Sequence, residues 1–270
     1  MSAPSPTVPA ARRLTLSPGE YRQLIELVGV DMPPGWEPEQ NADATTATAQ
    51  LRTRGVLVDE GVHPAVVRNL EILARPMAMV ETTASIANRG SRSLHAVAGE
   101  LGASLFALDG ALELSMFAAV TLGQELIRAV PAERADQSIA ARLGDTGESP
   151  ESPWGRVPLD ALHELGVAEL LSGADSRAHS VATERLDLPA DQAELVTRAS
   201  RSDGGLQCVV TTRTGAQVAA TVVVWLHGDF GWLGLLPDPD SSGHRMVRLV
   251  PAAREDLGTW VAPLIAAALS

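Results

Sequence analysis

Residues 206–236 read LQCVVTTRTGAQVAATVVVWLHGDFGWLGLL, and this stretch carries the clearest fold signal in the chain. It contains three strand-like runs of apolar, β-branched and alternating residues, separated by two short turn sequences. The runs are Leu206–Arg213, Gln217–Leu226 and Phe230–Leu236, and the turns are Thr214-Gly215 and His227-Gly228-Asp229. Runs of this kind joined by short turns are typical of antiparallel hairpins. We therefore predict an antiparallel meander, with a fourth strand at His244–Val250.

A second meander is predicted in the first half of the chain. Its predicted strands are Met77–Ile86, Leu94–Glu100, Leu105–Leu108 and Leu112–Met116. Asp109-Gly110 is a strong signal for a two-residue hairpin turn, and the cluster Asn88–Arg92 predicts another turn.

Helices are predicted around both meanders. Ser17-Pro18-Gly19-Glu20 has the pattern of a capping box and starts the first helix. Apolar residues at helical spacing predict further helices. These lie at Ala42–Thr53, from Pro64 to Pro76, and at Phe117–Ala129, Pro158–Ser172 and Asp187–Ala199, with a last one after Pro251.

The order helix, meander, helix therefore occurs twice, at roughly Pro64–Val130 and Pro189–Ser270. We predict an α+β fold with two quasi-symmetric halves around a central antiparallel sheet. The predicted organisation is one compact domain, in which a disordered N-terminal tail (1–16) precedes an N-terminal α+β half (17–130). A linker (131–157) then leads to a C-terminal α+β half (158–270).

Composition excludes several classes of function. The 270 residues carry a formal net charge of −12, which repels a phosphate backbone and an anionic membrane surface. All 21 basic side chains are arginine, so mechanisms that need a Schiff-base lysine or a phosphate-binding lysine are excluded. Arginine-only, alanine-rich coding is also typical of a high-GC genome, such as an actinobacterial one.

The sequence predicts a cytoplasmic protein that does not insert into a membrane. The single cysteine, Cys208, allows no internal disulfide and is expected to be a buried structural thiol. No apolar run reaches 18 residues, and Met1–Arg13 lacks the apolar segment of a signal peptide.

No residue pattern indicates catalysis. None of the six histidines is placed at metal-ligand spacing, and Gly-x-Ser-x-Gly is absent. The glycine clusters lead into predicted strands, whereas phosphate-binding glycines lead into helices. We therefore predict no catalytic, cofactor-binding or metal-binding residues, no cofactor, and no enzymatic activity.

Four residues are candidates for contacting a protein partner. Trp225 and Trp232 flank the same predicted turn, and tryptophan is enriched among interface anchors, although a place in the core is the alternative. Arg89 and Arg92 lie in the predicted turn Asn88–Arg92, where a solvated turn is the alternative to a partner contact.

One region resembles the N-terminal half of the EspG family, the cytosolic chaperones of actinobacterial type VII (ESX) secretion. The resemblance is carried by QLRTRGVL at residues 50–57, HPAVVRNLEILARP at residues 63–76, and the strand that leads to Gly99 and Ala103. In the second half it rests on Trp225, the Gly231-Trp232 turn, Leu249-Val250-Pro251 and the C-terminal helix.

The resemblance implies an α+β fold of two quasi-symmetric halves and a role as a secretion chaperone. Members of the family bind the apolar helical tip of PPE proteins in PE–PPE heterodimers and keep these substrates soluble for the secretion machinery. By position, Asn88–Arg92 matches a loop that can touch the partner in the family. A different secreted helical protein, for example one of WXG type, is an alternative partner.

Two rival functions remain open at this point. The first is an enzyme or sensor with a small-molecule site at the junction of the two halves, where polar groups from each could converge. The second is a structural paralogue that acts only through self-association, as a homodimer.

Overall fold

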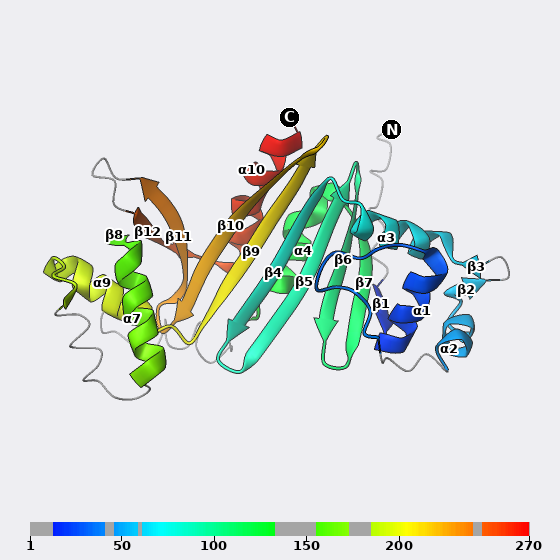
Figure 1. The fold of residues 1–270 in the computed structure, drawn as a ribbon, viewed down its shortest axis with the longest axis horizontal. Coiled ribbons are helices and arrows are strands. Elements are labelled where there is room, and N and C mark those ends of the chain that lie inside the picture. The colour runs from blue at the N-terminus through cyan, green and yellow to red at the C-terminus, as the bar shows by residue number, and fades with distance from the viewer. Residues whose placement is uncertain are drawn as a thin grey trace, which may run out of the picture.

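The fold was analysed in a computed structural model, which describes residues 13–40, 46–58, 61–132, 155–172, 185–239 and 245–269. Its centre is a ten-stranded antiparallel sheet in the order β1-β7-β6-β5-β4-β9-β10-β11-β12-β8 (Figure 1). The strands of the first half are β1 (Arg13–Leu16), β4 (Ala78–Ile86), β5 (Arg89–Ala98), β6 (Leu101–Leu108) and β7 (Ala111–Ala118). Those of the second half are β8 (Gly155–Pro158), β9 (Gly204–Thr214), β10 (Gln217–Gly228), β11 (Gly231–Pro239) and β12 (Arg245–Ala252).

Helices pack on both faces of this sheet. In the first half they are α1 (Pro18–Val28), α2 (Ala47–Thr53), α3 (Pro64–Ala74), the 3₁₀ turn η1 (Ala119–Thr121) and α4 (Leu122–Ala129). In the second half they are α7 (Leu159–Ser172), α9 (Ala190–Ser200), the 3₁₀ turn η2 (Arg254–Asp256) and α10 (Leu257–Leu269). A small hairpin, β2 (Leu57–Val58) with β3 (Gly61–Val62), joins α2 to α3. No helix in the described ranges is long and apolar enough to cross a membrane.

The two halves repeat one element order. Each begins with a short edge strand, β1 or β8, continues through helices into a four-stranded meander, and ends with a 3₁₀ turn and a closing helix. The halves join where β4 pairs with β9, so one sheet runs through both (Figure 1). The prediction of an α+β fold with two quasi-symmetric halves around a central antiparallel sheet is confirmed.

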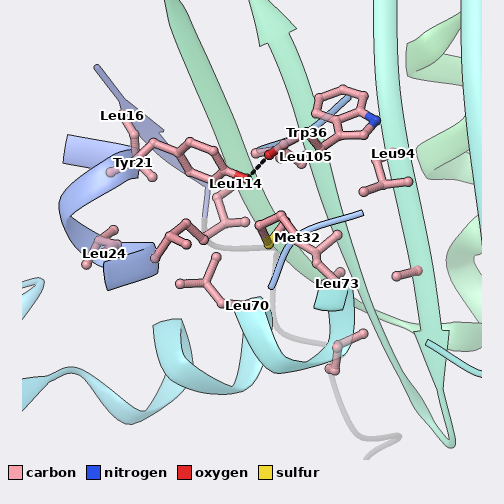
Figure 2. Packing of buried hydrophobic residues seen from close by; sticks show 14 of the residues in the cluster. Leu16, Tyr21, Leu24, Met32, Trp36, Leu70, Leu73, Leu94, Leu105 and Leu114 are labelled. Carbon is pink, nitrogen blue, oxygen red and sulfur yellow. Dashed lines mark hydrogen bonds between the residues drawn. The ribbon is translucent and has the colours of Figure 1, made fainter. Parts of the chain in front are cut away.

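Three apolar clusters hold the helices on the sheet. The first lies under α1 and α3, where Tyr21, Leu24, Leu70 and Leu73 meet Leu94, Leu105 and Leu114 of the strands (Figure 2). The second lies on the opposite face, under α4 and α10, and is built around Trp225. The third lies under α7 and α9 and contacts β11 and β12.

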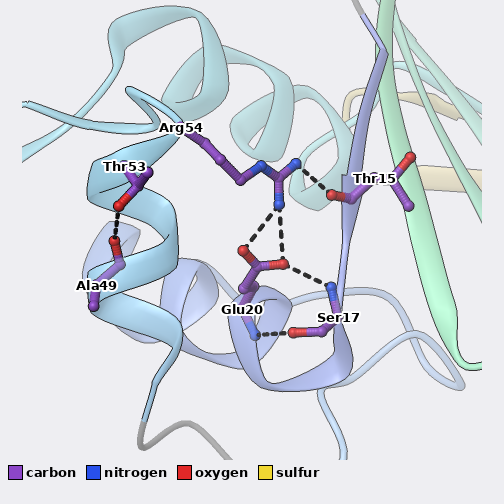
Figure 3. Close-up of polar contacts among 6 residues, drawn as sticks. All are labelled: Thr15, Ser17, Glu20, Ala49, Thr53 and Arg54. Carbon is purple, nitrogen blue, oxygen red and sulfur yellow. Dashed lines mark hydrogen bonds and ion pairs between the residues drawn. The ribbon is translucent and has the colours of Figure 1, made fainter.

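A buried carboxylate fixes the start of α1. The Ser17 hydroxyl accepts a hydrogen bond from the Glu20 amide, and Glu20 accepts one from the Ser17 amide, which completes the predicted capping box (Figure 3). Arg54 donates to the same carboxylate at 2.9 Å and to the carbonyl of Thr15. Glu20 and Arg54 together therefore connect α1, the end of α2 and the edge strand β1.

The structure corrects several predicted boundaries. Residues 13–16 form strand β1 by pairing with β7, so the predicted tail of residues 1–16 extends too far. The last residues of the predicted linker belong to β8, and most of that linker lies outside the described residues. The helix predicted to start at Phe117 begins at Leu122, because β7 continues to Ala118 to pair with β6.

A further correction concerns the first turn of the meander in the first half. Only Ala87 and Asn88 form this turn, and β5 begins at Arg89, so the predicted turn Asn88–Arg92 is mostly strand. Ala87 adopts a left-handed conformation with φ 50°, which a two-residue hairpin turn of this kind requires. Its amide donates to the carbonyl of Asp203, so the turn is held by the second half.

The closing helices cross at two glycines. Leu122-Gly123 begins α4 and Leu257-Gly258 begins α10, each directly after a 3₁₀ turn. A Cβ atom on Gly258 would lie 2.8 Å from the Gly123 Cα, a distance that real Cβ contacts essentially never show. The close packing of α4 against α10 therefore depends on the absence of side chains at this crossing.

We expect Gly258→Ala to lower the free energy of unfolding by about 1–3 kcal/mol, because the new methyl group meets backbone that cannot rotate away. Gly166→Ala is the matched control, since Gly166 lies inside α7 with open space around its Cβ position. That control should raise the stability by about 0.5–1 kcal/mol. Urea denaturation of both variants measures the difference, and equal effects would contradict the proposed crossing.

Candidate partner-binding surface

The helices leave the middle of one sheet face uncovered. Helices α1 and α3 cover one end of this face, α7 and α9 cover the other end, and α4 and α10 lie behind the sheet (Figure 1). Between the two ends, one face of β4, β9 and β10 is open. We call this surface the open face. Its residues are Thr83, Ser85, Gln207, Val209, Thr211, Ala220, Val222 and Val224.

Strand alternation places these residues together. Their sequence neighbours, such as Cys208 and Trp225, point to the other side and are buried under α10. The ladder brings Thr83, Gln207 and Val224 into one row across the three strands. The open face therefore combines aliphatic and uncharged polar side chains, with Val222 49% exposed near its edge, and the exposed Arg213 follows Thr211 on the same side of β9.

The loop of residues 31–40 borders the open face on the side of the first half. Trp36 of this loop is buried, and its backbone carbonyl accepts a 2.7 Å hydrogen bond from the Tyr21 hydroxyl (Figure 2). Its indole nitrogen donates to Glu81 of β4 at 3.1 Å. Arg92 of β5 pairs with the same carboxylate at 2.8 Å and lies 4.5 Å from the centre of the indole ring.

These contacts give the two predicted arginines different environments. Arg92 holds the loop to the sheet through Glu81 and Trp36, a role that the sequence did not reveal because these residues lie 11 to 56 positions apart. Arg89 is exposed at the first position of β5. Arg89 is therefore the member of the pair that a partner could reach most freely.

The two predicted tryptophans are core residues. Trp225 is fully buried, and Trp232 is only 3% exposed. Their rings lie 6.1 Å apart, and Trp260 of α10 packs on Trp225 at 5.5 Å. Their strand positions point the rings toward α10, which corrects the prediction that they contact a partner. They anchor the closing helix behind the open face.

A shallow groove of about 520 Å³ lies on the reverse side of the β9–β10 hairpin. Residues from β9, β10 and α10 line it: Thr212, Thr214, Gln217, Val218, Ala219, Thr221 and Leu264. This lining has no histidine and no carboxylate. The groove therefore lacks the histidines and carboxylates that would favour the enzyme-or-sensor rival.

Buried titratable groups belong to the core and not to a reactive site. Burial raises the pKa of the Cys208 thiol to about 12, so the thiol stays protonated and unreactive. Burial, with a smaller contribution from the charge of Arg128, lowers the pKa of His95 to about 3. Among the residues that the structure describes, no three metal-binding side chains gather in one place.

One histidine–carboxylate pair was missed by the sequence analysis. His227 Nδ1 lies 2.6 Å from Asp203, because the register of β9 and β10 brings together residues 24 positions apart. His227 and Gly228 are the last residues of β10. The turn therefore lies at Asp229-Phe230 and not at the predicted His227-Gly228-Asp229. The Asp203 amide also donates to the His227 carbonyl, so the pair secures the junction between β9, β10 and the Ala87 turn.

Comparison with known proteins gives a structural match and no sequence match. No family model matches the chain, and no curated protein matches it in sequence. The fold is similar to that of the Mycobacterium tuberculosis type VII secretion system chaperone EspG5, solved in complex with the PE25–PPE41 dimer. The TM-score is 0.61 at 14% sequence identity, and the alignment covers 96% of each chain. The chain therefore has an EspG-like fold, and the predicted resemblance is confirmed at the level of the fold.

We expect Arg92→Gln to lower the free energy of unfolding by about 1 kcal/mol, because it removes a half-exposed ion pair and a cation–π contact. Arg89→Gln is the matched control on the same strand and should change stability by less than about 0.5 kcal/mol. Thermal unfolding and limited proteolysis of the 31–40 loop measure the effect. Equal stability of the two variants would show that Arg92 does not hold the loop.

The buried His95 predicts a specific dependence of stability on pH. The unfolded chain takes up a proton at this residue below about pH 6.5, whereas the folded chain does so only near pH 3. The stabilising contribution of neutral His95 is therefore complete above pH 6.5 and is lost progressively as the pH falls toward 3. The loss is at most about 1.4 kcal/mol per pH unit.

Urea denaturation at several pH values between 4 and 7 tests this dependence. His95→Phe should give a flatter stability curve than the natural protein, whatever its absolute stability. His163→Phe, which changes an exposed histidine of α7, should keep the natural slope. A slope unchanged by His95→Phe would contradict this assignment.

Proposed function

We propose that this protein is a cytosolic chaperone of type VII secretion that binds a helical secretion substrate on its open face. The substrate would be a PE–PPE heterodimer or a helical pair of WXG type, kept soluble until it reaches the secretion machinery. The proposed activity needs no catalytic residue, cofactor or metal.

The observation that carries this proposal is the agreement between the fold and the uncovered surface. The chain is similar along nearly its whole length to EspG5, a chaperone solved with a PE25–PPE41 dimer bound. In this chain, helices cover both ends and the back of the sheet and leave β4, β9 and β10 open. A surface that is left open by an otherwise complete helical layer is suited to receive further helices.

The chemistry of the open face fits an amphipathic helix. Val209, Val222 and Val224 offer aliphatic area, whose burial stabilises a complex by about 25 cal/mol per Å² before the costs of association. Thr83 and Gln207 can exchange hydrogen bonds with polar groups beside an apolar helix stripe. Glu81 on the same side of β4 already pairs with Arg92, and the exposed Arg213 follows Thr211 on the same side of β9, so the end of the face at Arg213 carries a positive charge.

The rival small-molecule function has less support. A deep pocket at the junction of the halves, lined by two or more of the histidines with carboxylates, would favour it. The groove beside α10 lies within the second half, and its described lining contains neither residue type. The buried His95 and Cys208 are enclosed in the core, and a substrate could not reach them without unfolding.

Co-expression with candidate substrate pairs from the same genome tests the proposed function. We expect a cognate PE–PPE or WXG-type pair to become soluble and to copurify with the chain. Gln207→Arg, at the centre of the open face, should weaken the complex by about tenfold or more, which corresponds to about 1.4 kcal/mol.

Gln124→Arg is the matched control, because Gln124 is exposed on α4 behind the sheet. It introduces the same charge and should leave the affinity unchanged in isothermal titration calorimetry. If no helical pair is solubilised, the chaperone function fails. If a pair binds but Gln124→Arg weakens it as much as Gln207→Arg, the open face is not the binding surface.

A further inference from the structure

Strand β10 is paired along its full length on one side only. Its pairing with β9 runs from Gln217 to His227, whereas its pairing with β11 covers only Val224–Gly228. Strand β11 turns away from β10 after Leu235 and continues beside β12 (Figure 1). Among the described residues, no strand pairs with Gln217–Val223 on this side. We call this segment the inner edge.

The inner edge offers backbone hydrogen-bonding groups. Thr214 and Gln217 flank the two-residue turn at Gly215 and face each other in the ladder. Because backbone groups alternate in direction along an antiparallel strand, those of Gln217 point to β9, and those of the next residue point away. The amides and carbonyls of Val218, Ala220 and Val222 are therefore directed to the open side.

The inner edge also lacks the features that normally protect a strand edge. The two outer edges of the sheet are four-residue strands, and they carry Arg13 in β1 and Arg156 and Pro158 in β8. By contrast, Gln217–Val223 contains no charge, no proline and no glycine. Its first six residues are all exposed, with Val218 at 60% and Val222 at 49%. An exposed, uncharged and β-branched edge is a template for pairing with another strand.

We propose that the inner edge pairs with the inner edge of a second copy of this chain, in antiparallel register about a two-fold axis at Ala220. In this register Val218 of each copy lies opposite Val222 of the other, and Ala220 lies opposite its own copy. The two sheets then continue into each other through the β10 strands. Antiparallel pairing of identical strands has the two-fold symmetry that a closed homodimer needs.

Two properties of the sequence favour a second copy as the occupant. The segment Val218–Val222 reads VAATV, which is nearly symmetric about Ala220. On each side of the two-fold axis, a valine of one copy therefore lies opposite a valine of the other. The chain as a whole carries a net charge of −12, which opposes association, but residues 217–226 contain no charged side chain. The inner edge is therefore a place where two copies can approach without like charges facing each other.

The expected dimer is weak, because pairing seven residues buries less surface than a standard interface of about 800 Å² per partner. Sedimentation velocity of the full chain over a range of concentrations should show a reversible monomer–dimer equilibrium. Ala220→Lys places two ammonium groups opposite each other at the axis and should raise the dissociation constant by roughly tenfold or more.

Ala219→Lys is the matched control. Ala219 is exposed on the same strand, but its side chain points to the opposite face and lies next to Thr221 of the other copy, not next to its own equivalent. It adds the same charge and should change the dissociation constant much less. Ala220→Pro removes an outward amide without breaking the β9 ladder and should also weaken the dimer.

Amide hydrogen exchange distinguishes the proposed strand pairing from non-specific association. The amides of Val218, Ala220 and Val222, which point away from β9, should become protected as concentration rises, while other exposed amides do not. A chain that remains monomeric at high concentration would overturn the proposal. So would a dimer that Ala220→Lys and Ala219→Lys affect equally. These experiments use the chain alone, so their outcome is independent of the proposed chaperone function.

Discussion

The pairing of β4 with β9 is the constraint on which the rest of the structure depends. Nine residue pairs, from Ala78 with Thr212 to Ile86 with Gly204, join two halves that each contain their own meander. At the end of this ladder the strands approach so closely that a Cβ on Gly204 would lie 2.1 Å from the Ser85 carbonyl oxygen. Glycine at this position allows the sheet to remain continuous from one half to the other.

This junction determines where the helices can lie. Because β4 and β9 are the first strands of their meanders, the strands that follow extend outward in both directions. The helices that precede each meander pack near the outer strands, while the closing helices α4 and α10 meet each other behind the centre. The front of the junction is consequently the part of the sheet that neither half covers. The open face follows from the duplicated layout and needs no special insertion.

Local sequence patterns predicted the elements but not their long-range environment. Alternating runs and the Asp109-Gly110 turn identified the meanders, because strand periodicity and hairpin turns are encoded by neighbouring residues. Strands β1 and β8 were missed, since four residues are too few to show a period and their pairing partners are distant in sequence. The same reason explains Arg92, whose role depends on Trp36 and Glu81.

The candidate surface was only partly accessible to such reasoning. Trp225 and Trp232 pointed to the correct hairpin but to its buried side, because the sequence alone does not say which face a closing helix covers. The informative signal was the alternation itself. Thr83, Ser85, Gln207 and Thr211 interleave with buried residues on β4 and β9, which marks a strand face that is not part of the core. The inner edge gave no such signal, because the divergence of β11 from β10 is a property of the assembled sheet.

The open face and the inner edge share Ala220 and Val222 but offer different atoms there. A helix satisfies its own backbone groups, so it can contact the Val222 side chain but cannot pair with the strand edge, whereas a strand needs the Val222 backbone. A second copy on the inner edge would border the β10 side of the open face and leave Thr83 and Gln207 free. A helix bound to such a dimer would therefore lie over β4 and β9, while a helix bound to the monomer could also extend across β10. Self-association at the inner edge would thus narrow the surface available to a partner without closing it.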